Sequence, residues 1–227
     1  MKDPERDREW NMTASGRPFF PFDPRPQDIH VPDVGHMLAA QPRFRGATRE
    51  PYSVGQHSVL AARRMRELHA STPADVTAGY TADECAAYGL THDASEFVFG
   101  DTPRPHKKRP ELAEAMAAER RLQSMIYTFV GLDPEKEPPL LKLIDRRLLR
   151  TEQHHLMPPP QWGERRDDVA LLEPYGTALL ELGIPTPDHE GGFPVWSFER
   201  TRQAWLWEFH RLEQLGILCN PHAPART

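Results

Sequence analysis

The chain has 227 residues, of which 38% are hydrophobic and 27% are charged, and its formal net charge at pH 7 is −5. This length and composition predict one domain, or one domain with appendages, that buries a core of its own. The acidic balance argues against nonspecific binding to duplex DNA, which depends on neutralising phosphates, but local basic clusters still suit a small anionic substrate.

The sequence does not predict a membrane-spanning segment or a secretory signal. No stretch approaches the ~18 consecutive apolar residues needed to cross a bilayer. The charged start "MKDPERDREW" is not typical of a secretory signal, and Cys85 and Cys219 form neither a disulfide framework nor a metal-binding spacing. We therefore expect a cytoplasmic protein with no membrane association and no stable nucleic-acid complex.

The first third of the chain predicts an arm followed by two helices. Residues 1–30 read as an extended arm, because "GRPFFPFDPRPQDIHVPD" holds too many prolines for a helix. A short helix follows at about 32–41, and "PRFRGATREPY" reads as a basic loop. Ser53 then begins a long helix, and with Gln56 it fits a capping box in which the Gln56 side chain reaches back to the first turn.

Thr81 and Glu84 form a second capping box, and we expect the helix that they begin to continue to Phe99 and to end at Gly100. Proline and glycine positions bound further helices at about 110–130, 139–156, 168–182 and 197–215. Strand-type alternation is weak throughout. The sequence thus predicts an all-α fold: an arm over 1–30, a helical core over 31–156, and a C-terminal helical extension over 157–227 that packs on the core.

Three of these helices carry ligand-type polar residues where packing predicts apolar ones. His57 lies in the first turns of its helix, His92 and Asp93 are adjacent on the next, and Asp145 lies inside "PLLKLIDRRLLRTE", with leucines one turn to either side. An unpaired carboxylate on that apolar stripe would be costly. A divalent cation shared by the four residues would remove the cost.

Two imidazoles and two carboxylates suit one divalent transition metal (Mn, Co, Zn, Fe or Ni), or Mg with a polyphosphate substrate. Glu96 follows His92 by four residues, so on a continuous helix it lies one turn further on the same face, where it could move a proton. Basic residues flank these positions and suit a phosphate group: Arg43, Arg45, Arg49, Arg104, Lys107, Lys108 and Arg109.

Structural interpretations compete with these functional ones. A single interior histidine is usually a hydrogen-bonded core residue, and an adjacent His-Asp pair is a weak signal by itself. Trp205 and Trp207 fit the core and the surface of the last helix better than a stacking platform. We interpret the remaining histidines as surface or structural residues: His30, His36, His69, His106, His154, His155, His189, His210 and His222.

Several segments together resemble the HD-domain metal-dependent phosphohydrolases. They are "YSVGQHS", "LTHDASE", "GDTPRPHKK" and "LIDRRLLRTE", which keep the order H…HD…D of that superfamily. "HDASE" followed by "GDTPRP" looks like the 5′-deoxynucleotidase subgroup, related to phage dATP triphosphohydrolases. The N-terminal "SGRPFFPFDPRPQDIHVPDVGHML" and "RFRG" resemble phage or prophage members. The resemblance covers about residues 13–155 and implies an HD-domain helical bundle.

By position, the resemblance implies His57, His92, Asp93 and Asp145 as metal ligands, and Glu96 as the acid/base residue that positions water. Asp93 and Arg43 join Glu96 in the catalytic set, with Arg43 contacting phosphate. The resemblance also suggests substrate-binding residues, of which Phe44 replaces a tryptophan of the family: Arg43, Phe44, Arg45, Asp101, Thr102 and Lys107.

The implied function is metal-dependent hydrolysis of 5′-deoxynucleoside monophosphates to nucleoside and phosphate. One alternative is a dNTP triphosphohydrolase that releases tripolyphosphate, for which the basic residues would supply charge. An alternative of another class is a noncatalytic nucleotide-binding HD module, which the presence of all five metal and acid/base positions disfavours. A cyclic-dinucleotide phosphodiesterase is disfavoured further, because its "GYP"-type signature is missing. By resemblance we expect a homo-oligomer.

Overall fold

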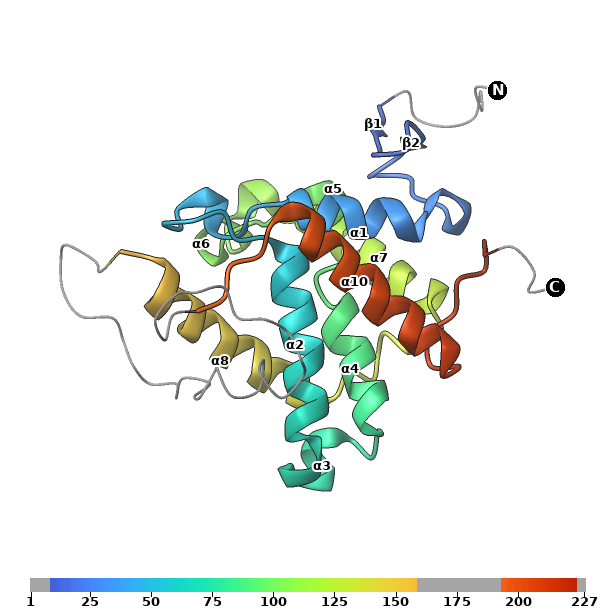
Figure 1. The fold of residues 1–227 in the computed structure, drawn as a ribbon. Helices are drawn as coiled ribbons and strands as arrows, with labels where there is room; N and C mark the ends of the chain where they lie inside the picture. Colours follow the sequence, from blue (N-terminus) through green and yellow to red (C-terminus); the bar gives the residue numbers. More distant parts are fainter. Residues whose placement is uncertain (1–8, 159–192, 224–227) are drawn as a thin grey trace.

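The computed structural model describes residues 9–158 and 193–223, which form a predominantly helical fold with one two-stranded hairpin (Figure 1). This confirms the predicted all-α class. No helix among the described residues is long and apolar enough to cross a membrane. The elements in chain order are β1 (Asn11–Met12), β2 (Pro18–Phe19), η1 (Pro26–Asp28), α1 (Val31–Ala40), η2 (Arg43–Gly46), α2 (Val54–Leu68), η3 (His69–Ser71), α3 (Ala74–Thr77), α4 (Ala82–Thr91), α5 (Glu96–Phe99), α6 (Arg104–Lys107), η4 (Pro110–Leu112), α7 (Ala113–Phe129), α8 (Pro139–Leu156) and α10 (Phe198–Gln214).

Helix α2 is the centre of the fold and contacts α1, α4, α8 and α10 (Figure 1). Two glycines allow its closest approaches. A Cβ at Gly89 of α4 would lie 2.9 Å from backbone atoms of Ala62, and a Cβ at Gly55 would lie 2.9 Å from the Ala39 nitrogen of α1. Because backbone atoms cannot yield as a flexible side chain can, a larger residue at position 89 would push the C-terminal end of α4 away from α2.

The two predicted capping boxes differ in outcome. At Thr81 the box is confirmed: the Thr81 N–H donates to Glu84 Oε2 over 2.7 Å, and the Glu84 N–H donates to Thr81 Oγ1 over 3.2 Å. At Ser53 the hydroxyl does accept from the Gln56 N–H. The Gln56 side chain, however, is fully buried and binds the Pro194 carbonyl and the Trp196 N–H instead. That half of the predicted box is wrong, because a buried amide must meet its partners where the C-terminal segment packs on α2.

The predicted continuous helix to Phe99 is wrong as well. Helix α4 ends at Thr91, and α5 begins only at Glu96. Between them the Ala94 N–H donates to the Thr91 carbonyl and the Glu96 N–H to the Asp93 carbonyl, each over 3.0 Å, so the chain is wound tighter than an α-helix. The Ser95 N–H donates to a side chain of α7 rather than to the carbonyl four residues earlier.

The predicted N-terminal arm contains the short β1–β2 hairpin and is therefore not extended throughout. Its anchor is aromatic: Phe19 is fully buried and meets Phe97 edge to face at 5.0 Å between ring centroids. The helix predicted from Pro110 begins as a 3-10 turn before α7. The helix predicted at 168–182 lies outside the described residues. On α10, Trp205 is 1% exposed and Trp207 is 58% exposed, which confirms their predicted core and surface positions.

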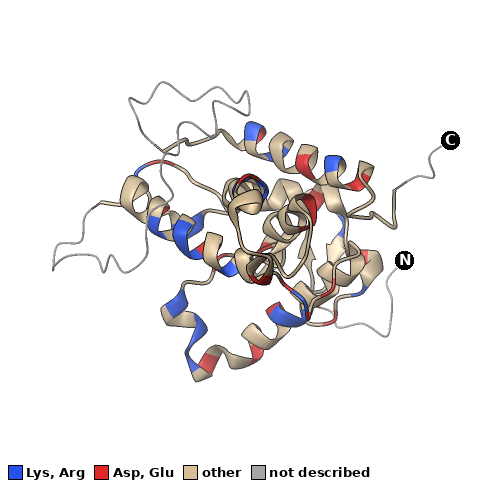
Figure 2. Ribbon diagram, turned by 90° about the horizontal axis from the view of Figure 1, so that it is seen from below, with Lys and Arg blue, Asp and Glu red and all other residues tan. Residues whose placement is uncertain are grey.

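Helix α10, from the predicted extension, is joined to the core by charge as well as by apolar packing. Acidic and basic positions are both spread along it (Figure 2). The buried Glu208 accepts from Arg63 Nε over 2.7 Å and from Arg66 Nη2 over 2.9 Å. Asp83 of α4 accepts from Arg66 and from Arg211, over 2.8 Å and 2.6 Å. This network connects α10 to both α2 and α4.

Candidate metal centre

Three of the four predicted metal ligands form a compact group. His57 comes from α2, His92 from the end of α4, and Asp145 from α8, and one ligand atom of each lies within 4.8 Å of the others. The two Nε2 atoms are 3.2 Å apart, and His57 Nε2 is 3.4 Å from Asp145 Oδ1. Helices distant in sequence thus bring two imidazoles and a carboxylate to one point, a donor set that suits a divalent transition metal.

The other nitrogen of each imidazole has a partner that sets the orientation of the ring. His92 Nδ1 lies 2.9 Å from the Gly89 carbonyl oxygen, and His57 Nδ1 lies 2.6 Å from Glu152 Oε1. A carbonyl oxygen only accepts, so His92 Nδ1 carries the hydrogen, and in the neutral ring the Nε2 lone pair faces the group. Histidine metal ligands have this arrangement, in which the remote N–H donates to an oxygen.

Asp93, the fourth predicted ligand, lies beside this group rather than in it. Its Oδ2 is 3.3 Å from His92 Nε2 and 3.8 Å from His57 Nε2. The same oxygen accepts from Arg43 Nη1 over 3.3 Å. Asp93 therefore faces the centre while a guanidinium neutralises part of its charge.

The charges of the centre perturb one another strongly. Burial would lower the pKa of His92, but the Asp93 carboxylate outweighs burial and raises that pKa to about 9. Burial would raise the pKa of Asp93, yet the imidazole of His92 holds it below its ordinary value. Asp145 has a lowered pKa because its hydrogen bond to His57 outweighs its burial. A metal ion and protons would therefore compete for the same imidazole nitrogens.

Glu152 is a member of the site that the sequence analysis missed. It is fully buried and accepts from three donors: His57 Nδ1 over 2.6 Å, Tyr52 Oη over 2.7 Å and Arg43 Nε over 3.2 Å. It follows Asp145 by seven residues, two turns along the same face of α8, and that spacing was the available signal. Its carboxylate fixes the His57 ring and balances the buried Arg43 charge.

Glu96, the predicted acid/base residue, is 3% exposed, and its N–H donates to the Asp93 carbonyl although α4 does not continue to it. Burial, Asp93 and Asp101 raise its pKa well above the ordinary value, outweighing the opposite effect of Lys107. Its Oε2 has no hydrogen-bond partner among the described residues. A buried carboxyl with a raised pKa binds a proton more tightly than an exposed one, a property that suits transfer of a proton to or from a neighbouring group.

Arg43 and the loop after it form one wall of the site. Arg43 is 7% exposed and is bonded to Glu152 and Asp93. Phe44 and Arg45 both have a φ of 54°, the left-handed conformation that costs a side-chain-bearing residue about 1–2 kcal/mol. The Phe44 N–H donates to Asp101 Oδ2 over 2.8 Å, which ties this turn to the segment that follows α5.

Most of the remaining predicted substrate-binding residues lie near this turn or near Glu96. Arg45 Nη1 is 3.1 Å from Nδ1 of His106, which is exposed, as predicted. Lys107 Nζ is 3.5 Å from Glu96 Oε1 and 3.1 Å from Glu119 Oε1. Thr102 is half-buried next to Asp101 in sequence. Glu119, buried on α7, is a second residue that the sequence analysis missed.

Comparison with known proteins adds little about chemistry. No protein-family model matches the chain. An uncharacterized protein of Rhodobacter capsulatus is 35% identical over 102 residues, which is 44% of this chain and 47% of that protein. The chain thus spans about half the length of this relative, whose name gives no activity.

Proposed function

We propose that the protein is a metal-dependent nucleotide phosphohydrolase of the HD-domain type, acting on 5′-deoxynucleoside monophosphates. The observation that carries the proposal is the convergence of the imidazole Nε2 atoms of His57 and His92 with the Asp145 carboxylate, beside a buried carboxyl, Glu96, with a raised pKa. The sequence resemblance supports the same reading, because these residues match the superfamily pattern in order.

Each residue has a role that follows from its contacts. His57, His92 and Asp145, with Asp93 alongside, would hold a divalent metal, which would supply Lewis-acid polarisation of a phosphoryl oxygen. Glu96 takes a proton from the attacking water, or returns one to the leaving oxygen, because burial and the nearby carboxylates of Asp93 and Asp101 raise its pKa and make it a stronger base than an exposed carboxylate. Arg43 keeps Asp93 and Glu152 in place through its guanidinium.

A triphosphate substrate is the second candidate, and the cationic residues on this side of the site favour it. Arg45 and His106 meet at the surface, and the Lys107 side chain is 37% exposed above Glu96. These cationic groups could neutralise a longer phosphate chain. A noncatalytic nucleotide-binding module is the alternative of another class, and the intact set of ligands and Glu96 weighs against it.

The test is a screen of dNMPs, NMPs and dNTPs with Mn²⁺, Co²⁺, Zn²⁺ and Mg²⁺. Inorganic phosphate from a dNMP supports the first candidate, and tripolyphosphate from a dNTP supports the second. Nucleotide binding without turnover under any of these metals would support the noncatalytic module and refute both enzymes.

Glu96→Gln keeps the size of the side chain but removes its proton exchange. We expect at least a 100-fold loss of turnover with metal binding retained, which is within the usual contribution of general acid–base catalysis. Glu114→Gln, at an exposed position of α7, is the matched control and should leave turnover unchanged. Full turnover by Glu96→Gln would show that the assigned role is wrong.

A further inference from the structure

The break between α4 and α5 has a specific cause in the side chain of Gln123. In a continuous helix the Ser95 N–H would donate to the Thr91 carbonyl. Instead the Ser95 N–H donates to Gln123 Oε1 over 3.0 Å, and Gln123 Nε2 donates to the Thr91 carbonyl over 2.8 Å. One amide from α7 thus occupies the place of the missing helical hydrogen bond and satisfies both of its ends.

The break changes what His92 and Asp93 can do together. Successive side chains of an α-helix point about 100° apart around the axis. Here His92 Nε2 and Asp93 Oδ2 lie 3.3 Å apart, and both lie close to His57 Nε2. The tightened turn that follows Thr91 therefore allows two adjacent residues to face one point.

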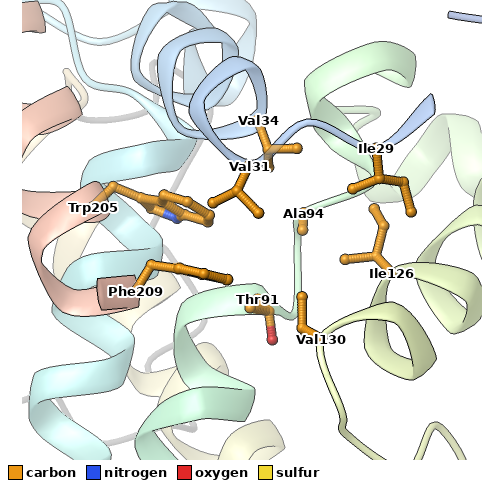
Figure 3. A pocket seen from close by; sticks show the side chains of 9 residues that line it. All are labelled: Ile29, Val31, Val34, Thr91, Ala94, Ile126, Val130, Trp205 and Phe209. Carbon is orange, nitrogen blue, oxygen red and sulfur yellow. The ribbon is translucent and has the colours of Figure 1, made fainter. Parts of the chain in front are cut away.

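The opposite side of the break is apolar and contains a small cavity. Thr91 and Ala94 line it together with Trp205 and Phe209 of α10 (Figure 3). The Thr91 hydroxyl on this side donates to the Ala87 carbonyl of its own helix and not to the backbone of the break. Of the contacts described here, the Gln123 amide is the one that bridges the two ends of the break.

We propose that Gln123 is a positioning residue of the metal centre: it holds the helix open so that His92 and Asp93 face the metal together. The inference rests on the proposed metal centre but concerns a residue that touches neither the metal nor a substrate. Without the amide, the Ser95 N–H would be left buried and unpaired, a cost of about 1–3 kcal/mol, and the Thr91 carbonyl would keep only the Ala94 N–H as a donor. Rejoining them to each other as an ordinary helical turn removes that cost and moves Asp93 away from His92.

The experiment compares Gln123→Met with Tyr127→Phe by calorimetric titration with Co²⁺ alone. Both variants lose part-buried hydrogen bonds of α7: two at Gln123, and one at Tyr127, whose Oη donates to Glu137 Oε1 over 2.8 Å. We expect Gln123→Met to weaken Co²⁺ binding at least tenfold and Tyr127→Phe to change it less than threefold. Gln123→Glu, which can accept from Ser95 but cannot donate to Thr91, should fall between the wild type and Gln123→Met.

A crystal structure of metal-free Gln123→Met gives a readout that does not depend on metal binding. We expect the Ser95 N–H to donate to the Thr91 carbonyl and the His92–Asp93 contact to be lost. An unchanged break would overturn the inference even if Co²⁺ bound weakly, and so would wild-type affinity in the variant. If Gln123→Met fails to fold, the same two measurements on Gln123→Glu decide. Failure of the wild-type protein to bind Co²⁺ would instead refute the metal centre of the proposed function.

Discussion

Replacing Glu152 by glutamine tests whether the carboxylate that holds the His57 ring contributes to metal binding. The carboxylate accepts two donors on Oε1, from His57 and Tyr52, and one on Oε2, from Arg43. An amide offers one acceptor oxygen and one NH₂ group. The favoured orientation of the glutamine amide keeps its oxygen toward His57 and Tyr52. The NH₂ group then faces the Arg43 guanidinium, so that two donors oppose each other. The negative charge that balances Arg43 is also lost.

Two magnitudes follow from this geometry. Breaking a buried, hydrogen-bonded ion pair by removing one partner costs about 3–5 kcal/mol of folding free energy. Because the retained oxygen still accepts from His57, the ring keeps its orientation but loses the charged partner that strengthens it as a ligand. Loss of such a supporting group typically weakens metal binding about 10- to 100-fold, or about 1.4–2.7 kcal/mol.

The assay is Co²⁺ titration, with urea unfolding in excess EDTA to measure folding separately. Glu208→Gln is the matched control, because Glu208 is also buried and bonded to arginines but belongs to the α2–α4–α10 network. It should lose folding stability while keeping its affinity for Co²⁺. Equal Co²⁺ affinity in Glu152→Gln and wild type would refute the reasoning about His57.

Two further predictions concern the folding stability, first at acid pH and then with a bound metal ion. Arg66 and Arg63 outweigh the burial of Glu208 and hold its pKa below the ordinary 4.5, and hydrogen bonds from Arg211 and Arg66 outweigh burial and lower that of Asp83 below 3.8. The stability from these pairs is complete above those values and is lost as the pH falls through the lower folded-state pKa values. Glu208→Gln should therefore flatten the decline of unfolding free energy below about pH 4.5, measured by urea denaturation, and an unchanged slope would contradict the assignment. Co²⁺ or Mn²⁺ at about 100 times its dissociation constant should add about 2.7 kcal/mol to the stability, and His92→Ala should abolish most of that gain, as thermal unfolding would show.

Local sequence signals predicted the helices well, because caps and breakers act over a few residues. Ser53, Thr81 and Ser197 each accept from the backbone of the first turn of their helix, as expected of helix caps. The apolar spacing around Asp145 likewise indicated that its carboxylate faces inward, where it meets His57. Both results follow from side-chain periods that a sequence displays directly.

The residues that support the site could not be found in this way. Gln123 breaks a helix on which it does not lie, and nothing in "GLTHDASEFVFG" marks the interruption. Glu119 reaches the site only because α7 passes the segment that carries Lys107. Such contacts depend on how helices pack against one another, and the helix propensities of single residues do not describe packing.

The turn at "RFRG" contains another feature that is invisible to propensity, and it makes a last prediction. Arg45 has a φ of 54°, where glycine is unstrained and alanine is not. Both Arg45→Gly and Arg45→Ala lose the bond to His106, so their difference isolates the backbone. The left-handed cost of about 1–2 kcal/mol, less the roughly 0.4–1 kcal/mol by which glycine favours the unfolded chain, predicts at the midpoints of these ranges that Gly is more stable than Ala by about 0.8 kcal/mol.

At the exposed helical position Arg146 the order should reverse, with Ala about 1 kcal/mol more stable than Gly, because no left-handed conformation offsets the cost of glycine there. Urea unfolding of the four variants measures both differences. If Ala were the more stable residue at both positions, the turn would not be strained in solution. If the order reverses, the chain stores conformational energy beside Asp101 and Arg43, in the wall where we expect the phosphate to bind.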